Sequence, residues 1–88
     1  MYSLKFSPQA MEDIAYFKKT GNTAIQNKIT KLAKELEEHP TTGTGKVETL
    51  RFELTGLWSR RINSEHRMVY RIDESSKEVN VLSLRGHY

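Results

Sequence analysis

The hydrophobic pattern of this chain changes its period once, and this change separates helical from extended structure. Between residues 8 and 38 the apolar residues recur at helical spacing, whereas from residue 47 onward apolar and polar residues alternate. A loop rich in threonine and glycine, residues 41–45, lies between the two parts. A chain of 88 residues has room for one compact domain with one modest core. The sequence therefore predicts a single α+β domain over residues 1–88.

Two helices are expected in the first half of the chain, after a short strand over residues 2–6. Ser7 is a good helix cap and Pro8 suits the first helical position, so the first helix should begin there and run to about Lys19. The second helix should end at Pro40. The apolar stripe of this second helix consists of Ile25, Ile29, Leu32, Ala33 and Leu36.

Four strands are expected in the second half of the chain. The alternating segments cover residues 47–54, 57–62, 66–72 and 78–84. The polar turns between them are short, which suits antiparallel neighbours, because parallel strands need long crossovers. The predicted order is β-α-α-β-β-β-β, with the two helices packed on one face of a small antiparallel sheet.

Arginine and lysine are divided between the two halves of the chain, which carries a net charge of +3. All six arginines lie between residues 51 and 85, while most lysines lie in the predicted helices. The planar guanidinium pairs with phosphate through two hydrogen bonds, whereas lysine is a hydrated point charge. The sheet is therefore predicted to carry an arginine-rich binding surface.

Location in the cytoplasm, without a membrane association, is expected from what the sequence lacks. There is no cysteine to form a disulfide, and no apolar run approaches the roughly 20 residues that a membrane helix needs. The first ten residues do not show the basic and then apolar order of a signal peptide.

Side chains alternate between the two faces of a strand, so the sequence also predicts what each face carries. Met68, Tyr70 and Ile72 should face the helices. The side chains expected on the other face are Arg67, Val69, Arg71, Val79, Val81, Ser83, Arg85 and His87. This set assumes a register in which Val69 lies opposite Val81 and Arg67 opposite Ser83, and a slip of one residue would change it.

Taken singly, each of these residues has an ordinary explanation. Exposed arginines such as Arg60 usually belong to the solvated face of a sheet, and a lone glutamate such as Glu48 is usually a surface residue. Trp58 lies between apolar strand residues and suits the core better than a base-stacking role. His66 stands beside a turn, where histidines are more often incidental than catalytic.

Taken together, four motifs resemble the YoeB branch of the RelE-like toxins. They are GKVETL at residues 45–50, LTGLWSRRI at residues 54–62, EHRMVY at residues 65–70, and the final His87 and Tyr88. The resemblance spans essentially the whole chain. It implies a RelE-like ribonuclease fold and a ribosome-dependent endoribonuclease that is neutralised by an antitoxin encoded beside it.

The resemblance also implies the site. The catalytic residues that it implies are Glu48, Arg67, His87 and Tyr88, and the phosphate-binding residues are Lys46, Arg51, Arg60 and Arg61. Two positions depart from the family pattern. Arg51 stands where the family usually has a lysine, and Gly86 precedes His87 where a bulkier residue is usual.

The residue types suit cleavage of RNA by its own 2′-hydroxyl group. Glu48 is expected to be the general base and His87 the general acid, while Arg67 and Arg61 stabilise the charge on the phosphate. Tyr88 either stacks on a base or orients the phosphate. No metal and no other cofactor is expected, because the glutamates and histidines show no ligand spacing.

The expected partners are messenger RNA, the A site of the small ribosomal subunit, and an acidic, partly disordered antitoxin of the YefM kind. Promoter DNA would be bound only through this antitoxin, and a homodimer is also allowed. The main alternative is a non-catalytic subunit of a repressor complex that binds RNA or the antitoxin. A small-molecule enzyme is disfavoured, because so small a domain offers little volume for a closed pocket.

Overall fold

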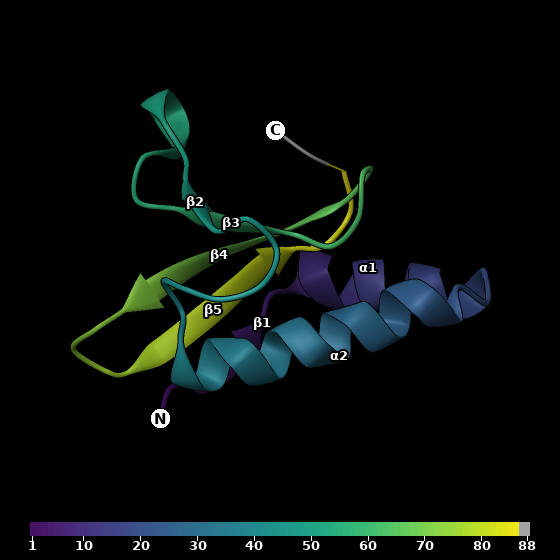
Figure 1. The fold of residues 1–88 in the computed structure, drawn as a ribbon, viewed down its shortest axis with the longest axis horizontal. Coiled ribbons are helices and arrows are strands. Elements are labelled where there is room, and N and C mark those ends of the chain that lie inside the picture. The colour runs from purple at the N-terminus through teal and green to yellow at the C-terminus, as the bar shows by residue number, and fades with distance from the viewer. Residues whose placement is uncertain (87–88) are drawn as a thin grey trace.

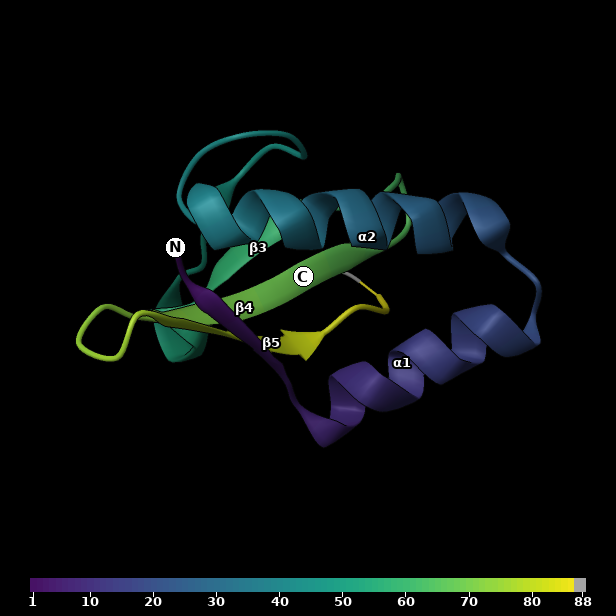
Figure 2. The same cartoon turned by 90° about the horizontal axis from the view of Figure 1, so that it is seen from below.

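The computed structural model describes residues 1–86 and confirms the α+β fold class (Figure 1). Its elements are β1 (Ser3–Phe6), α1 (Pro8–Lys19), α2 (Thr23–Glu38), β2 (Glu48–Thr49), the 3-10 helix η1 (Phe52–Leu54), β3 (Trp58–Arg61), β4 (Arg67–Asp73) and β5 (Glu78–Ser83). Both helices lie on the same side of the sheet, as Figures 1 and 2 show from two directions. The opposite face of the central strands is thereby left free of helices.

Both helices begin at the side-chain caps that short polar residues provide. The Ser7 hydroxyl accepts a hydrogen bond of 3.0 Å from the Ala10 amide, and Pro8 occupies the first turn, as predicted. The same hydroxyl donates to the Leu82 carbonyl at 2.7 Å, which joins the start of α1 to β5. At the start of α2, the Asn22 side chain accepts from the Ile25 amide at 3.2 Å.

The sheet is mixed, which corrects the expectation that it is wholly antiparallel. The strand order is β1-β5-β4-β3-β2, and β1 pairs with β5 in the parallel sense, whereas the other three pairs are antiparallel. A parallel neighbour requires a long crossover. Here α1, α2 and the whole remainder of the sheet lie between the two strands in the sequence, so this requirement is met.

The strand predicted over residues 47–54 is mostly absent. Only Glu48 and Thr49 pair with β3, and η1 follows. Phe52 has a φ angle of 58° and an exposed fraction of 88%, so its backbone is left-handed and its side chain points into solvent. A left-handed residue cannot continue a strand. The apolar and polar alternation of this segment therefore reflects a turn with an exposed aromatic ring.

The core lies between the helices and the sheet, as predicted for the apolar stripe of α2 and for β4. Met68 and Tyr70 are fully buried and Ile72 packs against them. On β5 the prediction is wrong, since Val79 and Val81 are also fully buried in this core.

The cause of this error is a β-bulge in the pairing of β4 with β5. Tyr70 pairs with Val81, but its neighbour Val69 pairs with Ser83, so the side chain of Leu82 has no direct partner. An extra residue inverts the alternation of faces along one strand. Val81 therefore faces the helices, while Ser83 lies on the opposite face, and the predicted pairing of Arg67 with Ser83 does not occur.

Candidate functional site

The face of the sheet away from the helices brings together side chains from β2, β3 and β4. Glu48 lies opposite Ser59, and Arg61 lies opposite Arg67. Residues that face each other on neighbouring strands share one face of the sheet. Glu48, Arg61 and Arg67, three of the residues singled out in the sequence, thus lie on the same face.

The Glu48 carboxylate stands between two cationic groups. Its Oε1 atom lies 4.0 Å from Arg67 Nη1 and 3.8 Å from Lys46 Nζ. The side chain of Glu48 is 41% exposed, whereas that of Arg67 is only 14% exposed. Arg67 is held further by a hydrogen bond of 3.3 Å from Nη1 to the Ser59 hydroxyl. The arrangement presents an accessible proton acceptor beside a fixed guanidinium.

Gly86, the residue before His87, is hydrogen-bonded to the segment that carries Arg67. The Arg67 amide donates to the Gly86 carbonyl at 2.8 Å, and the Gly86 amide donates to His66 Nδ1 at 2.9 Å. His87 and Tyr88 themselves, both implied by the resemblance, lie outside the described residues. The residue before them is nevertheless fixed to the strand that carries Arg67.

Arg60 occupies a different place from the one expected for a phosphate-binding residue. It lies opposite Met68 on the helix side of the sheet and is fully buried. Its Nη2 atom donates to the carbonyls of His39 and Thr42, at 2.9 and 2.8 Å, and Nη1 lies 3.9 Å from a Glu35 carboxylate oxygen. The prediction that Arg60 binds a phosphate is therefore wrong, because its guanidinium group is buried on the helix side of the sheet. Instead it holds the loop that connects α2 to Lys46 and Glu48.

Glu35 completes this buried cluster from the side of α2. Its Oε1 atom accepts a hydrogen bond of 3.0 Å from the Thr44 amide. Thr44, through this amide above all and then through its side chain, lowers the pKa of Glu35 below its usual value, and the positive charge of Arg60 adds a smaller effect, although partial burial opposes the shift. Arg60, which is fully buried, and Glu35, which is partly buried, thus hold the loop by hydrogen bonds to two carbonyl groups and one amide group.

Close packing also fixes the last residues of this loop. The Arg61 amide donates to the Gly45 carbonyl. A Cβ atom at Gly45 would lie 2.7 Å from both Arg60 Cγ and the Arg61 carbonyl oxygen, and the φ angle of Gly45 is +95°. Only glycine satisfies both conditions. The backbone therefore passes directly over β3 just before it delivers Lys46 and Glu48.

The remaining arginines are distributed around the site. Arg61 is exposed beside Arg67, whereas Arg51 is exposed after β2 and lines a shallow hollow with Glu48 and Trp58. Trp58 is partly buried against the core, as predicted. Arg85 does not extend the Glu48 face, since its guanidinium carbon lies 3.6 Å from the ring centroid of Tyr16 on α1.

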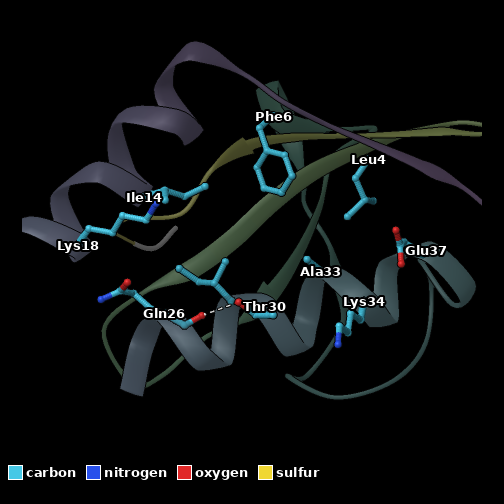
Figure 3. Close-up of a pocket in the computed structure, with 10 residues that line it drawn as sticks. Leu4, Phe6, Ile14, Lys18, Gln26, Thr30, Ala33, Lys34 and Glu37 are labelled. Carbon is cyan, nitrogen blue, oxygen red and sulfur yellow. Dashed lines mark hydrogen bonds between the residues drawn. The ribbon is translucent and has the colours of Figure 1, made fainter. Parts of the chain in front are cut away.

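A second hollow, of about 380 Å³, lies between β1, α1 and α2 (Figure 3). Leu4, Phe6 and Ile14 point into it, and Lys18 and Lys34 stand at its margin. Its lining is mainly apolar, so it suits contact with an apolar group better than proton transfer. Glu48, Arg61 and Arg67 are instead gathered on the opposite side of the sheet.

Residues 1–86 contain neither a cluster of metal-ligating side chains nor a membrane-spanning helix. No three histidine, cysteine, aspartate or glutamate side chains gather there as a metal site would require. In the same range, neither helix combines the length and hydrophobicity needed to cross a bilayer.

The chain belongs to the YoeB-like toxins of bacterial type II toxin-antitoxin systems. The profile described as "YoeB-like toxin of bacterial type II toxin-antitoxin system" matches residues 6–88. Toxin YoeB of Mycobacterium bovis is 42% identical over 88 residues, which cover 100% of both chains. The resemblance noted in the sequence is confirmed by these matches.

Two solved structures share this fold at 40% sequence identity. The YoeB-YefM complex from Staphylococcus aureus superposes with a TM-score of 0.84 and covers 100% of this chain and 99% of that chain. The YoeB dimer from the same organism gives a TM-score of 0.86, with coverage of 99% and 98%. The arrangement of two helices on a mixed sheet is thus that of the YoeB fold.

Several residues that organise the site were missed in the sequence. The Ser59 hydroxyl accepts a hydrogen bond from Arg67. Ser59 lies two residues before Arg61 on the same strand, and this spacing was the signal that the two side chains share a face. His66 anchors Gly86, although it had been regarded as incidental. Asp13 is buried, with an exposed fraction of 2%, and accepts a hydrogen bond of 2.8 Å from the Leu84 amide. The available signal for Asp13 was its helical spacing from Ala10 and Phe17, the two apolar residues of α1 that are buried with it.

Proposed function

We propose that this protein is a metal-independent endoribonuclease that cleaves messenger RNA on the ribosome and so inhibits translation. The observation that supports this best is the pair formed by Glu48 and Arg67, with 4.0 Å between carboxylate and guanidinium on an open, basic face of the sheet. A single-stranded substrate can reach such a face without entering a closed pocket. The fastening of Gly86 beside Arg67 supports a role for His87 in the same reaction.

The proposed reaction is transfer of the phosphate within the RNA chain. Glu48 accepts the proton of the 2′-hydroxyl group, whose oxygen then bonds to the adjacent phosphorus. The bond from phosphorus to the 5′-oxygen breaks, and His87 donates a proton to that oxygen. The products are a 2′,3′-cyclic phosphate and a 5′-hydroxyl group. Positioned proton transfers of this kind each contribute roughly 10² to 10⁴ in rate.

Positive charge is proposed to stabilise the transition state. Arg67 is nearly buried and already oriented by Ser59, so little reorganisation is needed when charge develops on the phosphate. Arg61 and Lys46 lie on either side and would contact the flanking phosphates, with Arg51 further out. Tyr88 would stack on a base or orient the scissile phosphate. Metal ions have no part in this scheme.

The proposed partners follow from the same surface. An acidic, partly disordered segment of a YefM-like antitoxin would bind the basic face and cover Glu48 and Arg67. The relatives from Staphylococcus aureus support this partner, and also support a homodimer. Promoter DNA would be contacted through the antitoxin. The ribosome would supply the remaining contacts to the messenger RNA, and the protein would act on it in the cytoplasm.

The test is cleavage of a defined message on purified translating ribosomes, in the presence of a metal chelator at a concentration that the ribosomes tolerate. Glu48→Gln keeps the shape of the side chain and removes its charge, so cleavage should fall by about 10² or more. Glu53→Gln removes an exposed charge from η1 and should leave cleavage unchanged. The fragments should carry 2′,3′-cyclic phosphate and 5′-hydroxyl ends.

Three results would count against the proposal. An intact message with the wild-type protein would favour the non-catalytic repressor subunit instead. Equal cleavage by Glu48→Gln and the wild type would remove Glu48 as the base. Fragments with 3′-hydroxyl and 5′-phosphate ends would indicate hydrolysis by another mechanism.

A further inference from the structure

Gly86 is held by two consecutive residues at the start of β4. Its amide donates to His66 Nδ1 at 2.9 Å, and its carbonyl accepts from the Arg67 amide at 2.8 Å. The φ angle of Gly86 is +79°, and a Cβ atom there would meet nothing within 4 Å. Packing therefore contributes little to the position of Gly86. The two hydrogen bonds are what fix it.

The His66 ring is itself held firmly enough to serve as an anchor. Its side chain is only 12% exposed, and the ring packs edge to face on Phe17 with 5.1 Å between centroids. The Asn63 side chain accepts from the His66 amide at 2.7 Å, which fixes the turn. Nδ1 accepts a hydrogen bond, so in the neutral ring the proton is on Nε2, which lies 3.7 Å from a Glu65 carboxylate oxygen.

We infer that His66 is a positioning residue for the proposed nuclease reaction, because its Nδ1 atom fixes the backbone from which His87 follows. This inference rests on the proposed function, in which His87 is the general acid. A proton donor must be held within hydrogen-bond reach of its leaving group, and a displacement of about 1 Å costs up to 10²-fold in rate. Gly86 has no side chain that could fix this part of the backbone. Its position therefore depends on His66, whose Nδ1 atom accepts the hydrogen bond from the Gly86 amide.

Two substitutions of His66 separate the effect of the Nδ1 hydrogen-bond acceptor from the effect of ring packing. His66→Phe keeps an aromatic ring against Phe17 and removes the acceptor. His66→Asn loses the ring but places an oxygen where Nδ1 stood, two bonds from Cβ. We expect His66→Phe to lower kcat about 10- to 100-fold with little change in KM. His66→Asn should recover most of that loss, although it is the less stable of the two variants.

Phe17→Leu is the matched control for loss of packing. It removes the ring that His66 packs against and leaves the Nδ1 acceptor in place, so it should lower stability and keep kcat within about 3-fold of wild type. If His66→Phe is as active as the wild type, or if kcat of the three variants falls in proportion to their loss of stability, the positioning role is wrong.

A measurement without RNA distinguishes this inference from the proposed function. Hydrogen exchange of the Gly86 amide, followed by NMR on the free protein, should be at least about 10-fold faster in His66→Phe than in the wild type, and close to wild type in Phe17→Leu. Unchanged protection in His66→Phe would overturn the anchor itself. Lost protection together with an inactive wild-type protein would instead overturn the proposed function and leave the anchor standing.

Discussion

The guanidinium group of Arg60, in β3, donates a hydrogen bond of 2.8 Å to the carbonyl of Thr42, in the loop after α2. A fully buried cation thus holds the segment that delivers Lys46 and Glu48 to the open face of the sheet. Its charge is balanced by Glu35 at 3.9 Å. The position of the proposed general base therefore depends on a residue that cannot touch the substrate.

Replacement of Arg60 by methionine should destabilise the protein. The carbonyls of His39 and Thr42 would lose a charged donor, and each such hydrogen bond contributes about 1.5 to 3 kcal/mol. We expect the free energy of unfolding in urea to fall by about 3 kcal/mol. Arg71→Met removes an exposed arginine from β4 and should change it by less than about 0.5 kcal/mol. Equal effects of the two substitutions would mean that the buried cluster does not stabilise the fold.

Acid should weaken the same cluster through Glu35. The pKa of Glu35 in the folded protein lies below its ordinary value of 4.5, so the carboxylate stabilises the fold above that pH. This contribution is lost as the pH falls through the lower, folded value. Glu35→Gln should therefore be less stable than the wild type at pH 7, and the difference should shrink below about pH 4.5.

Urea unfolding of wild type and Glu35→Gln between pH 2.5 and 7 measures this dependence. Glu38→Gln removes a negative charge from an exposed position on α2 and should stay within about 0.5 kcal/mol of wild type at pH 7. A difference between wild type and Glu35→Gln that grows toward low pH would contradict the assignment.

Removal of the Asp13 carboxylate should loosen the end of β5. Asp13 accepts from the Gln9 side chain at 2.9 Å and from the Leu84 amide at 2.8 Å, and the second of these bonds is buried. Asp13→Ala leaves the Leu84 amide buried without an acceptor, which costs about 1 to 3 kcal/mol. Asp13→Asn retains an oxygen and should cost less. Thermal unfolding compares the two, and a smaller loss in Asp13→Ala would contradict this role.

Arg67→Lys should impair cleavage more than its retained charge suggests. Lysine cannot reproduce the fixed contact to Ser59, nor the planar set of donors that the proposed mechanism uses to hold the phosphate. We expect ribosome-dependent cleavage to fall by about 10²-fold, the loss typical of a missing transition-state donor. Arg71→Lys is the matched control, since Arg71 is exposed further along the same strand. Comparable activity of the two variants would remove Arg67 from the proposed mechanism.

Local patterns predicted the helices and β4 correctly, because their signals are complete within a few residues. The Ser7 cap, the Pro8 start and the apolar stripe of α2 are each formed by neighbours in the sequence. The alternation of Met68, Tyr70 and Ile72 predicted their burial for the same reason. The motifs and the resemblance named Glu48, Arg61 and Arg67 as site residues, and the strand pairing then shows that they share one face.

The errors arose where a distant contact decides the outcome. The bulge between β4 and β5 changes which side chains of β5 face the helices, and no pattern within the sequence of β5 indicates it. Arg60 was expected in solvent because charged side chains are rarely buried, yet it alternates with Trp58 and Ile62, both of which face the core side. That alternation was the signal that could have identified it. The turn at Phe52 depends on a left-handed backbone that other residues than glycine seldom adopt.

The parallel pairing of β1 with β5 has a consequence for how the protein is made. Ser3 pairs with Glu78, so almost the whole chain separates the two strands. During synthesis β1 emerges before β5 and has no neighbouring strand until β5 has been made, because β5 is the strand that connects it to the rest of the sheet. Contacts so far apart in sequence form slowly and late. The protein proposed to stop translation therefore completes its own sheet only after β5 has been translated.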